Sequence, residues 1–234
     1  MIILALDALD LKMVKKFNCK NLMQKEYGQT DISDFTQLRT VVLWASFLTG
    51  KNMEKQIPIK TQWNFQLSPD QTFLKYFEKY KTIDVPAFSF KQQNHAMERK
   101  LLKEYFEDKT TIEEYDEVIW RNHEENKKEF FEAVGKFNLT MGYFNLADAI
   151  GHLNFGITEK MAEVYNELDS IAKEIKNLDN NILIISDHGM KAVGRYGDHS
   201  ENGFYSSNHN LGLHIPKITS FYELIKKVAE NEHA

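Results

Sequence analysis

The sequence predicts an α/β protein with a mainly parallel central sheet that carries helices on both faces, in three layers. Three short apolar segments, 2–6, 139–146 and 181–185, are each followed by a polar residue and a helical pattern, which is typical of buried strands. Continuous apolar runs separated by helices indicate parallel strands that are covered on both sides. The 234 residues and the hydrophobic content of 42% favour one main domain, 1–234, with an insertion.

The segments between and after these strands predict the helical layers. Residues 52–135 are densely charged with interspersed aromatics and begin with a helix-capping pattern, so we expect two to four helices that form an α-rich insertion or lid. Residues 161–178 carry an apolar residue at every third or fourth position, which predicts a crossover helix with one apolar face against the sheet. A terminal helix is expected over 218–231, beginning near Thr219 or Ser220.

Composition and charge exclude several classes of protein. The net charge of -5 argues against a broad basic surface, so no nucleic acid polymer is expected as a partner, whereas a small anionic ligand is compatible. A single cysteine, Cys19, excludes an intrachain disulfide and a Cys-rich zinc site. Asp7 interrupts the first apolar run, and no segment approaches the roughly 18 apolar residues of a membrane span. These features predict a cytoplasmic protein without a membrane partner.

Acidic and imidazole side chains follow all three predicted strands. Asp7 ends the first strand, Asp148 lies just beyond the second, and Asp187 and His188 end the third. Ligands of open α/β sheets bind beyond the carboxyl ends of the strands, so these residues should meet at one edge. If the chain turns helical after the second strand, His152 shares a helix face with Asp148. Clustered carboxylates without cations would repel one another, so divalent metal ions are expected; zinc suits Asp and His ligands, and manganese or iron is also compatible.

Thr40 begins an apolar stretch that has the pattern of a helix ending at Thr49-Gly50. A helix N-terminus would place free backbone N–H groups beside the Thr40 hydroxyl, an arrangement that suits a phosphate. A threonine hydroxyl activated by a metal ion would be a nucleophile. From the spacing alone, a simple helix cap is the commoner role, and both roles stay open.

The order of these motifs resembles the alkaline phosphatase superfamily, and within it the type I phosphodiesterase/nucleotide pyrophosphatase branch. The matching features are Asp7 after the first strand, Thr40 before an apolar helix ending in Thr-Gly, D-x-x-x-H at 148–152, S-D-H-G-M at 186–190 and G-x-H at 197–199. The resemblance implies an alkaline phosphatase-like fold and spans almost the whole chain except 52–135.

The resemblance also implies a site with two divalent metal ions, commonly zinc. One ion would be held by Asp148, His152 and a later histidine. The other would be held by Asp7, Asp187, His188 and the nucleophile Thr40. Phosphorus would lie between the two ions, and a covalent phosphothreonine would then be hydrolysed by water.

The later histidine is selected by the G-x-H pattern followed by an apolar segment and a Gly-containing loop, which favours His199 and leaves His209 as the alternative. His214 precedes Ile-Pro and is expected to be structural or exposed. The remaining candidates lie in charged or terminal segments, where solvated side chains are expected: His95, His123 and His233.

Two departures from the family pattern concern the site. Relatives usually have proline and asparagine soon after the nucleophile, where this chain has Val41–Trp44, and a glycine after the first aspartate, where it has Ala8. The missing asparagine would leave oxygen stabilisation to backbone N–H groups and the metal ions.

The function implied by the resemblance is hydrolysis of phosphodiester or pyrophosphate bonds in small nucleotide-like substrates. The alternatives are a phosphomonoesterase, another phosphoryl-transfer enzyme of the superfamily, and a catalytically silent, metal-containing protein that binds phosphoryl ligands. A sulfatase is disfavoured because the C/S-x-P-S-R context is absent around Thr40. Four aromatics could stack on a base, although aromatics at helical spacing are more often core residues: Trp63, Phe65, Tyr76 and Phe77.

Overall fold

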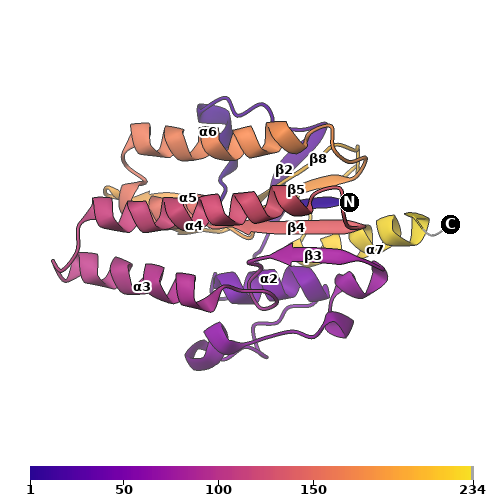
Figure 1. Ribbon diagram of the computed structural model, residues 1–234, viewed down its shortest axis with the longest axis horizontal. Coiled ribbons are helices and arrows are strands. Elements are labelled where there is room, and N and C mark those ends of the chain that lie inside the picture. The colour runs from indigo at the N-terminus through magenta and orange to yellow at the C-terminus, as the bar shows by residue number, and fades with distance from the viewer. Residues whose placement is uncertain (233–234) are drawn as a thin grey trace.

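The computed structural model describes residues 1–232 and has an α/β architecture built around a six-stranded sheet (Figure 1). The strand order in this part of the chain is β2-β8-β5-β1-β4-β3. The bounds are β1 Ile2–Leu6, β2 Glu26–Asp31, β3 Tyr80–Ile83, β4 Leu139–Phe144, β5 Ile182–Ile185 and β8 Asn202–Ser207. A separate hairpin consists of β6 Gly189–Val193 and β7 Tyr196–Ser200. The predicted α/β class is confirmed.

The three strands predicted from the sequence lie side by side at the centre of the sheet. β1 pairs in parallel with both β4 and β5, and β3 pairs in parallel with β4. β8 is antiparallel to β5 and to β2. In register, Leu6 lies opposite Phe144 and Ala5 lies opposite Ile185, so β1, β4 and β5 end at the same edge.

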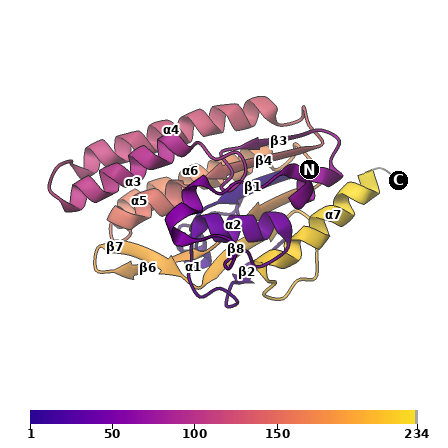
Figure 2. The same ribbon diagram turned by 90° about the horizontal axis from the view of Figure 1, so that it is seen from below.

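Helices cover both faces of the sheet. The α-helices are α1 Leu11–Lys16, α2 Thr40–Thr49, α3 Gln92–Phe106, α4 Ile112–Ala133, α5 Leu146–Asn154, α6 Thr158–Ile175 and α7 Phe221–Glu232. Short 3-10 helices are η1 Ile59–Asn64, η2 Pro69–Gln71, η3 Phe73–Tyr76 and η4 Ile218–Ser220. In Figure 2, α2 and α7 lie in front of the sheet, α6 lies behind it, and α4 runs along the top of the view. Residues of α4 and α6 pack in the same core cluster. Within residues 1–232, no helix combines the length and apolar character needed to cross a membrane.

Alternation along β1 divides the core into two clusters. Ile3 and Ala5 face the cluster formed with α2 and α7, and Ile2, Leu4 and Leu6 face the cluster formed with α4, α5 and α6. Successive side chains of a strand point to opposite faces, which is why a fully apolar β1 is buried on both sides.

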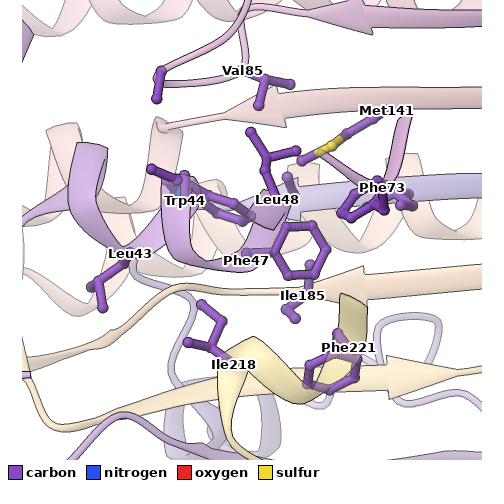
Figure 3. Close-up of a cluster of buried hydrophobic side chains, with 14 of the residues drawn as sticks. Leu43, Trp44, Phe47, Leu48, Phe73, Val85, Met141, Ile185, Ile218 and Phe221 are labelled. Carbon is purple, nitrogen blue, oxygen red and sulfur yellow. The ribbon is translucent and has the colours of Figure 1, made fainter. Parts of the chain in front are cut away.

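The α2 side of the core is rich in aromatic side chains, and Figure 3 shows Trp44 and Phe47 of α2 among them. Phe47 makes an edge contact with Phe73, with ring centroids 5.3 Å apart. Trp44 makes an edge contact with Tyr143 of β4, with ring centroids 5.6 Å apart, which holds α2, whose first residue is Thr40, against the sheet.

Residues 52–135 contain α3 and α4 but also β3, an edge strand that the sequence pattern did not predict. α4 packs directly on β4: a Cβ added to Gly142 would lie 2.5 Å from the ring of Phe130. This segment therefore contributes to the sheet and to the layer that covers it, besides carrying α3 farther out.

The helix boundaries differ slightly from the expected ones. Leu146 starts α5 instead of ending β4. α6 ends at Ile175, and Leu178, expected in its apolar stripe, is 53% exposed. The expected terminal helix is present as η4 followed by α7.

Candidate metal centre and catalytic site

The acidic and imidazole residues singled out in the sequence come together beyond the carboxyl ends of β1, β4 and β5. Two groups have ligand atoms that all lie within 4.8 Å of one another. One group is Asp7, Asp187 and His188, and the other is Asp148, His188 and His199. His188 therefore belongs to both groups, which joins them into a single cluster.

Around His188, the imidazole faces two buried carboxylates. His188 Nε2 lies 3.2 Å from Asp7 Oδ1 and 3.5 Å from Asp187 Oδ2. Its Nδ1 lies 3.0 Å from the Gly189 carbonyl oxygen. If Nδ1–H donates to this carbonyl, the Nε2 lone pair is directed toward the carboxylates, which is the arrangement of a metal-ligating histidine.

His152 and His199 approach Asp148 from two sides. His152 Nε2 lies 3.3 Å from Asp148 Oδ2, and His199 Nε2 lies 3.3 Å from Asp148 Oδ1. Each ring turns Nδ1 toward a backbone carbonyl: His152 toward Gly197 at 3.3 Å and His199 toward Leu38 at 3.0 Å. All three imidazoles of the cluster thus share one orientation, with Nε2 pointing at a carboxylate.

Several candidate ligand atoms of this cluster are buried and have no hydrogen-bond partner within residues 1–232. They are Asp7 Oδ1, Asp148 Oδ1, both carboxylate oxygens of Asp187, His188 Nε2 and His199 Nε2. Buried polar atoms are normally satisfied, because leaving one unpaired is costly. Carboxylate oxygens and imidazole nitrogens are ligands for divalent ions such as zinc and manganese, so the donor set fits a bound metal.

The electrostatics of the cluster favour binding of a cation. Burial, together with the nearby Asp7, raises the pKa of Asp187 well above its usual range. Burial opposes ionisation of Asp148 too, yet His152 and His199 hold the pKa of Asp148 well below its usual range. Asp148 in turn raises the pKa of His152. Carboxylates packed this closely favour cation binding, because a cation removes their mutual repulsion.

Tyr143 on β4 contacts the carboxylate of Asp7. Its hydroxyl donates a hydrogen bond to Asp7 Oδ2, and both side chains are buried. Burial and the negative charge of Asp7 raise the pKa of Tyr143 well above its ordinary value, so the hydroxyl keeps its proton.

Thr40 is the first residue of α2 and lines the same cavity as Asp7, Asp148 and His199. The cap position is occupied by Arg39, whose backbone is extended with φ -107 and ψ 118. A threonine that capped the helix would stand at that position, so the structure does not give Thr40 the cap role.

The cavity beside the cluster has a volume of about 220 Å³. One part of its wall is formed by Thr40 and by four residues of the Asp/His cluster, Asp7, Asp148, His152 and His199. Residues from 52–135 form another part, among them Trp63, Phe90, Arg99 and Leu102. The segment predicted as an insertion therefore contributes directly to the site.

Two other histidine candidates, His209 and His214, are exposed. His209 contacts the carbonyl of Asn180, which precedes β5, so it lies at the opposite end of that strand. His233 lies outside the described residues.

The expectation of solvated side chains was wrong for His95 and His123. His123 is 2% exposed and lies 3.1 Å from Glu167. His95 is 5% exposed, and its ring nitrogens lie 2.9 Å from Asp84 Oδ2 and 2.9 Å from Glu98 Oε2. Although burial lowers the pKa of His95, the two carboxylates raise it to about 9, so this ring is a cation at neutral pH.

Ala8 follows Asp7 with φ 57, in the left-handed region. Glycine adopts this region without steric cost, whereas alanine does not. The backbone conformation at this position therefore suits the glycine of the family pattern, although the residue here is alanine.

Comparison with protein families places this geometry in context. The family model of type I phosphodiesterase / nucleotide pyrophosphatase matches residues 75–202. The chain belongs to this family. The expected branch of the alkaline phosphatase superfamily, a branch of enzymes, is thus confirmed. The match includes Asp148, His152, Asp187, His188 and His199, and it begins inside 52–135.

Among solved structures, murine ectonucleotide pyrophosphatase / phosphodiesterase 5 matches this type I phosphodiesterase family chain with a TM-score of 0.47 and 13% sequence identity. The match covers 83% of this chain and 58% of that chain, so the chain spans less than two thirds of the murine protein's length. A search of curated proteins gives no match.

Proposed function

We propose that the chain is a metal-dependent hydrolase of phosphodiester or pyrophosphate bonds in small nucleotide-like substrates, with Thr40 as the nucleophile. The observation that carries this proposal is the set of buried oxygen and nitrogen atoms of Asp7, Asp148, Asp187 and His188 that have no hydrogen-bond partner within residues 1–232. Of these residues, Asp7 and Asp148 line the same cavity as Thr40. Membership of the type I phosphodiesterase family supports the reaction class.

Two divalent ions, zinc or manganese, would be held by two sets of residues. The first set is Asp7, Asp187 and His188, with Thr40 beside it. The second set is Asp148, His152 and His199. When bound, such ions supply positive charge that stabilises phosphoryl oxygens and favours an ionised nucleophile.

The chain's own residues prepare this site. The contacts of His152, His188 and His199 with backbone carbonyls fix the direction in which each Nε2 points. The hydrogen bond from Tyr143 holds the Asp7 carboxylate in one orientation.

The start of α2 would compensate for the asparagine that relatives carry after the nucleophile. The backbone N–H groups in the first turn of a helix have no acceptor within the helix, and Thr40 is the first residue of α2. The N–H groups at the start of α2 would donate to an oxygen of the reacting phosphoryl group, which takes on charge in the transition state.

In the reaction, Thr40 Oγ1 would form a bond to phosphorus while the bond to the leaving oxygen breaks, with the leaving group in line. Water would then attack the phosphothreonine, releasing the phosphoryl product and restoring the hydroxyl. The remaining cavity, toward Trp63 and Phe90, offers room for the part of the substrate beyond the reacting phosphorus.

The proposal is tested with purified protein loaded with zinc or manganese and analysed for metal content. Turnover of bis-p-nitrophenyl phosphate should exceed turnover of p-nitrophenyl phosphate. A preference for the monoester would replace the proposal with a phosphomonoesterase.

A second candidate is a metal-containing protein that binds phosphoryl ligands without turnover. The residues after Thr40 favour it, because Val41, Val42, Leu43 and Trp44 are all buried in the core and offer no side chain to a phosphate oxygen. Metal retention with nucleotide binding, but without turnover of either ester, would select this candidate.

A further inference from the structure

The wall of the cavity that Thr40 lines also contains a cationic side chain stacked on an aromatic ring. Arg99 of α3 lies over Trp63 of η1, with Cζ 3.9 Å from the ring centroid. Trp63 is nearly parallel to Phe90, at 15° with centroids 6.3 Å apart, and Phe90 stacks on His95 at 4.1 Å and 11°. All four side chains line the cavity that contains Thr40.

The guanidinium of Arg99 has no polar partner in the described part of the chain. Among residues 1–232, no hydrogen bond or ion pair engages it, although the side chain is half-buried. Burial lowers the pKa of Arg99, but a guanidinium stays charged in proteins. A cation that is partly withdrawn from water and faces a cavity favours an anion in that cavity.

The carboxylate of the adjacent residue, Glu98, contacts three other side chains. Its Oε1 accepts from Asn122 at 2.8 Å, and its Oε2 contacts His95 at 2.9 Å and accepts from Asn145 at 2.8 Å. The charge of Glu98 attracts the Arg99 guanidinium, but within residues 1–232 no hydrogen bond joins the two side chains.

The position of Arg99 also limits what Trp63 can do. The guanidinium of Arg99 covers one face of the Trp63 indole. On that face, a ligand would therefore meet the planar cation and not the aromatic ring. The aromatic surface fixes the plane of the guanidinium, and the fork of N–H groups matches two oxygens of a phosphoryl group.

We propose that Arg99, held in place by Trp63, is a specificity-determining residue that binds a second phosphoryl group on the substrate, beyond the reacting phosphorus. This inference rests on the proposed function, because it assumes that the reacting phosphorus lies beside Thr40. It predicts that substrates with two anionic phosphoryl groups are favoured over simple diesters.

The test compares metal-loaded wild type and variants on two probes. Bis-p-nitrophenyl phosphate carries one anionic phosphoryl group, and bis(p-nitrophenyl) pyrophosphate carries two. Arg99→Gln should lower the ratio of kcat/KM for the pyrophosphate to kcat/KM for the diester by about tenfold or more, because a charge-assisted contact is lost. The loss should fall mainly on the KM of the pyrophosphate. An unchanged ratio would overturn the proposal.

Two further variants separate charge, geometry and stacking. Lys100→Gln is the matched control, because it removes the same charge from the next residue of α3, whose side chain is exposed; the ratio should stay as in wild type. Trp63→Leu should lower the ratio less than Arg99→Gln, since the charge remains but its platform is lost. Equal losses on both probes in Trp63→Leu, with no change in Arg99→Gln, would mean that the wall stacks on the substrate and would contradict the role given to Arg99.

A binding measurement keeps this test separate from the proposed function. Methylenediphosphonate has two phosphoryl groups and is not hydrolysed, and orthophosphate has one. Calorimetry on the metal-loaded protein should show that Arg99→Gln weakens methylenediphosphonate several-fold more than orthophosphate. If wild type cleaves neither ester, the proposed function fails, and equal weakening of the two ligands would still reject the role of Arg99.

Discussion

The Tyr143 hydroxyl on β4 donates a hydrogen bond to the Asp7 carboxylate, which follows the adjacent parallel strand β1. This bond links the central sheet to the candidate metal centre. The two residues come from β4 and from the end of β1, and both are buried. Each strand alone would leave one buried polar group unpaired, so the pairing register of the sheet is what satisfies both. The site therefore depends on the core beneath it.

Replacing Tyr143 with phenylalanine should weaken metal binding by about 10- to 100-fold, because Asp7 loses the group that orients it. The free energy of unfolding should fall by about 1–3 kcal/mol, since Asp7 Oδ2 is left unpaired. Metal titration and urea unfolding measure the two effects. Tyr165→Phe is the control: this buried tyrosine accepts from the Asp10 backbone N–H, so stability should fall without a change in metal affinity. Unaltered metal affinity in Tyr143→Phe would show that the hydrogen bond has no supporting role.

His199→Ala should reduce metal affinity by more than about 100-fold, because the imidazole that faces Asp148 Oδ1 is a ligand in the proposed site. His209→Ala should bind metal like wild type, because this exposed ring contacts the carbonyl of Asn180. Metal content after gel filtration distinguishes the two. Loss of metal in His209→Ala, and not in His199→Ala, would reverse the assignment made between these histidines.

Thr40→Ala should lower kcat on a phosphodiester by roughly three orders of magnitude or more, as expected for loss of a nucleophile, while metal content is retained. Thr40→Ser should keep measurable turnover, since it keeps a hydroxyl at the start of α2. Thr61→Ala, at an exposed position of η1, controls for loss of any threonine. Full activity in Thr40→Ala would require another nucleophile.

The central strands were predictable because they are buried on both faces, as in Ile2–Leu6, and such strands are continuous apolar runs. β2 and β8 could not be predicted in the same way, because their sequences, "EYGQTD" and "NGFYSS", mix polar residues with glycine. The two strands also pair with each other across a long stretch of the sequence. β3 has only four residues at the sheet edge.

The candidate site followed from the strand ends, so Asp7, Asp187 and His188 could be brought together by topology alone. His95 could not. Its burial depends on Asp84, which follows the unpredicted β3, and the only local signal was Glu98 three residues later on the same helix. Arg99 was missed for the same reason, because its contact with Trp63 joins two segments that no sequence pattern connects.

The raised pKa of His95 predicts a pH-dependent stability. A histidine whose pKa is about 9 when folded, and near 6.5 when unfolded, contributes stability that is full below pH 6.5 and is lost as the pH rises through 9. The shift corresponds to roughly 3 kcal/mol. The difference in unfolding free energy between wild type and His95→Gln should therefore shrink from pH 6 to pH 9.5, measured by urea unfolding. His209→Gln, at an exposed position, should differ little from wild type at either pH. A difference independent of pH would mean that folding does not raise the pKa of His95.

The contact between Phe130 and Gly142 predicts that α4 belongs to the frame of the sheet. Gly142→Ala should destabilise the protein by about 1–3 kcal/mol, because the added methyl would lie 2.5 Å from the Phe130 ring. Phe130→Leu removes the ring and makes room, so the double variant should lose less than the sum of the single losses, with a coupling of about 0.5–3 kcal/mol. Phe73→Leu, in the cluster on the other face, should combine additively with Gly142→Ala. Additivity in both pairs would indicate that α4 can move away from the sheet, as a detachable lid would.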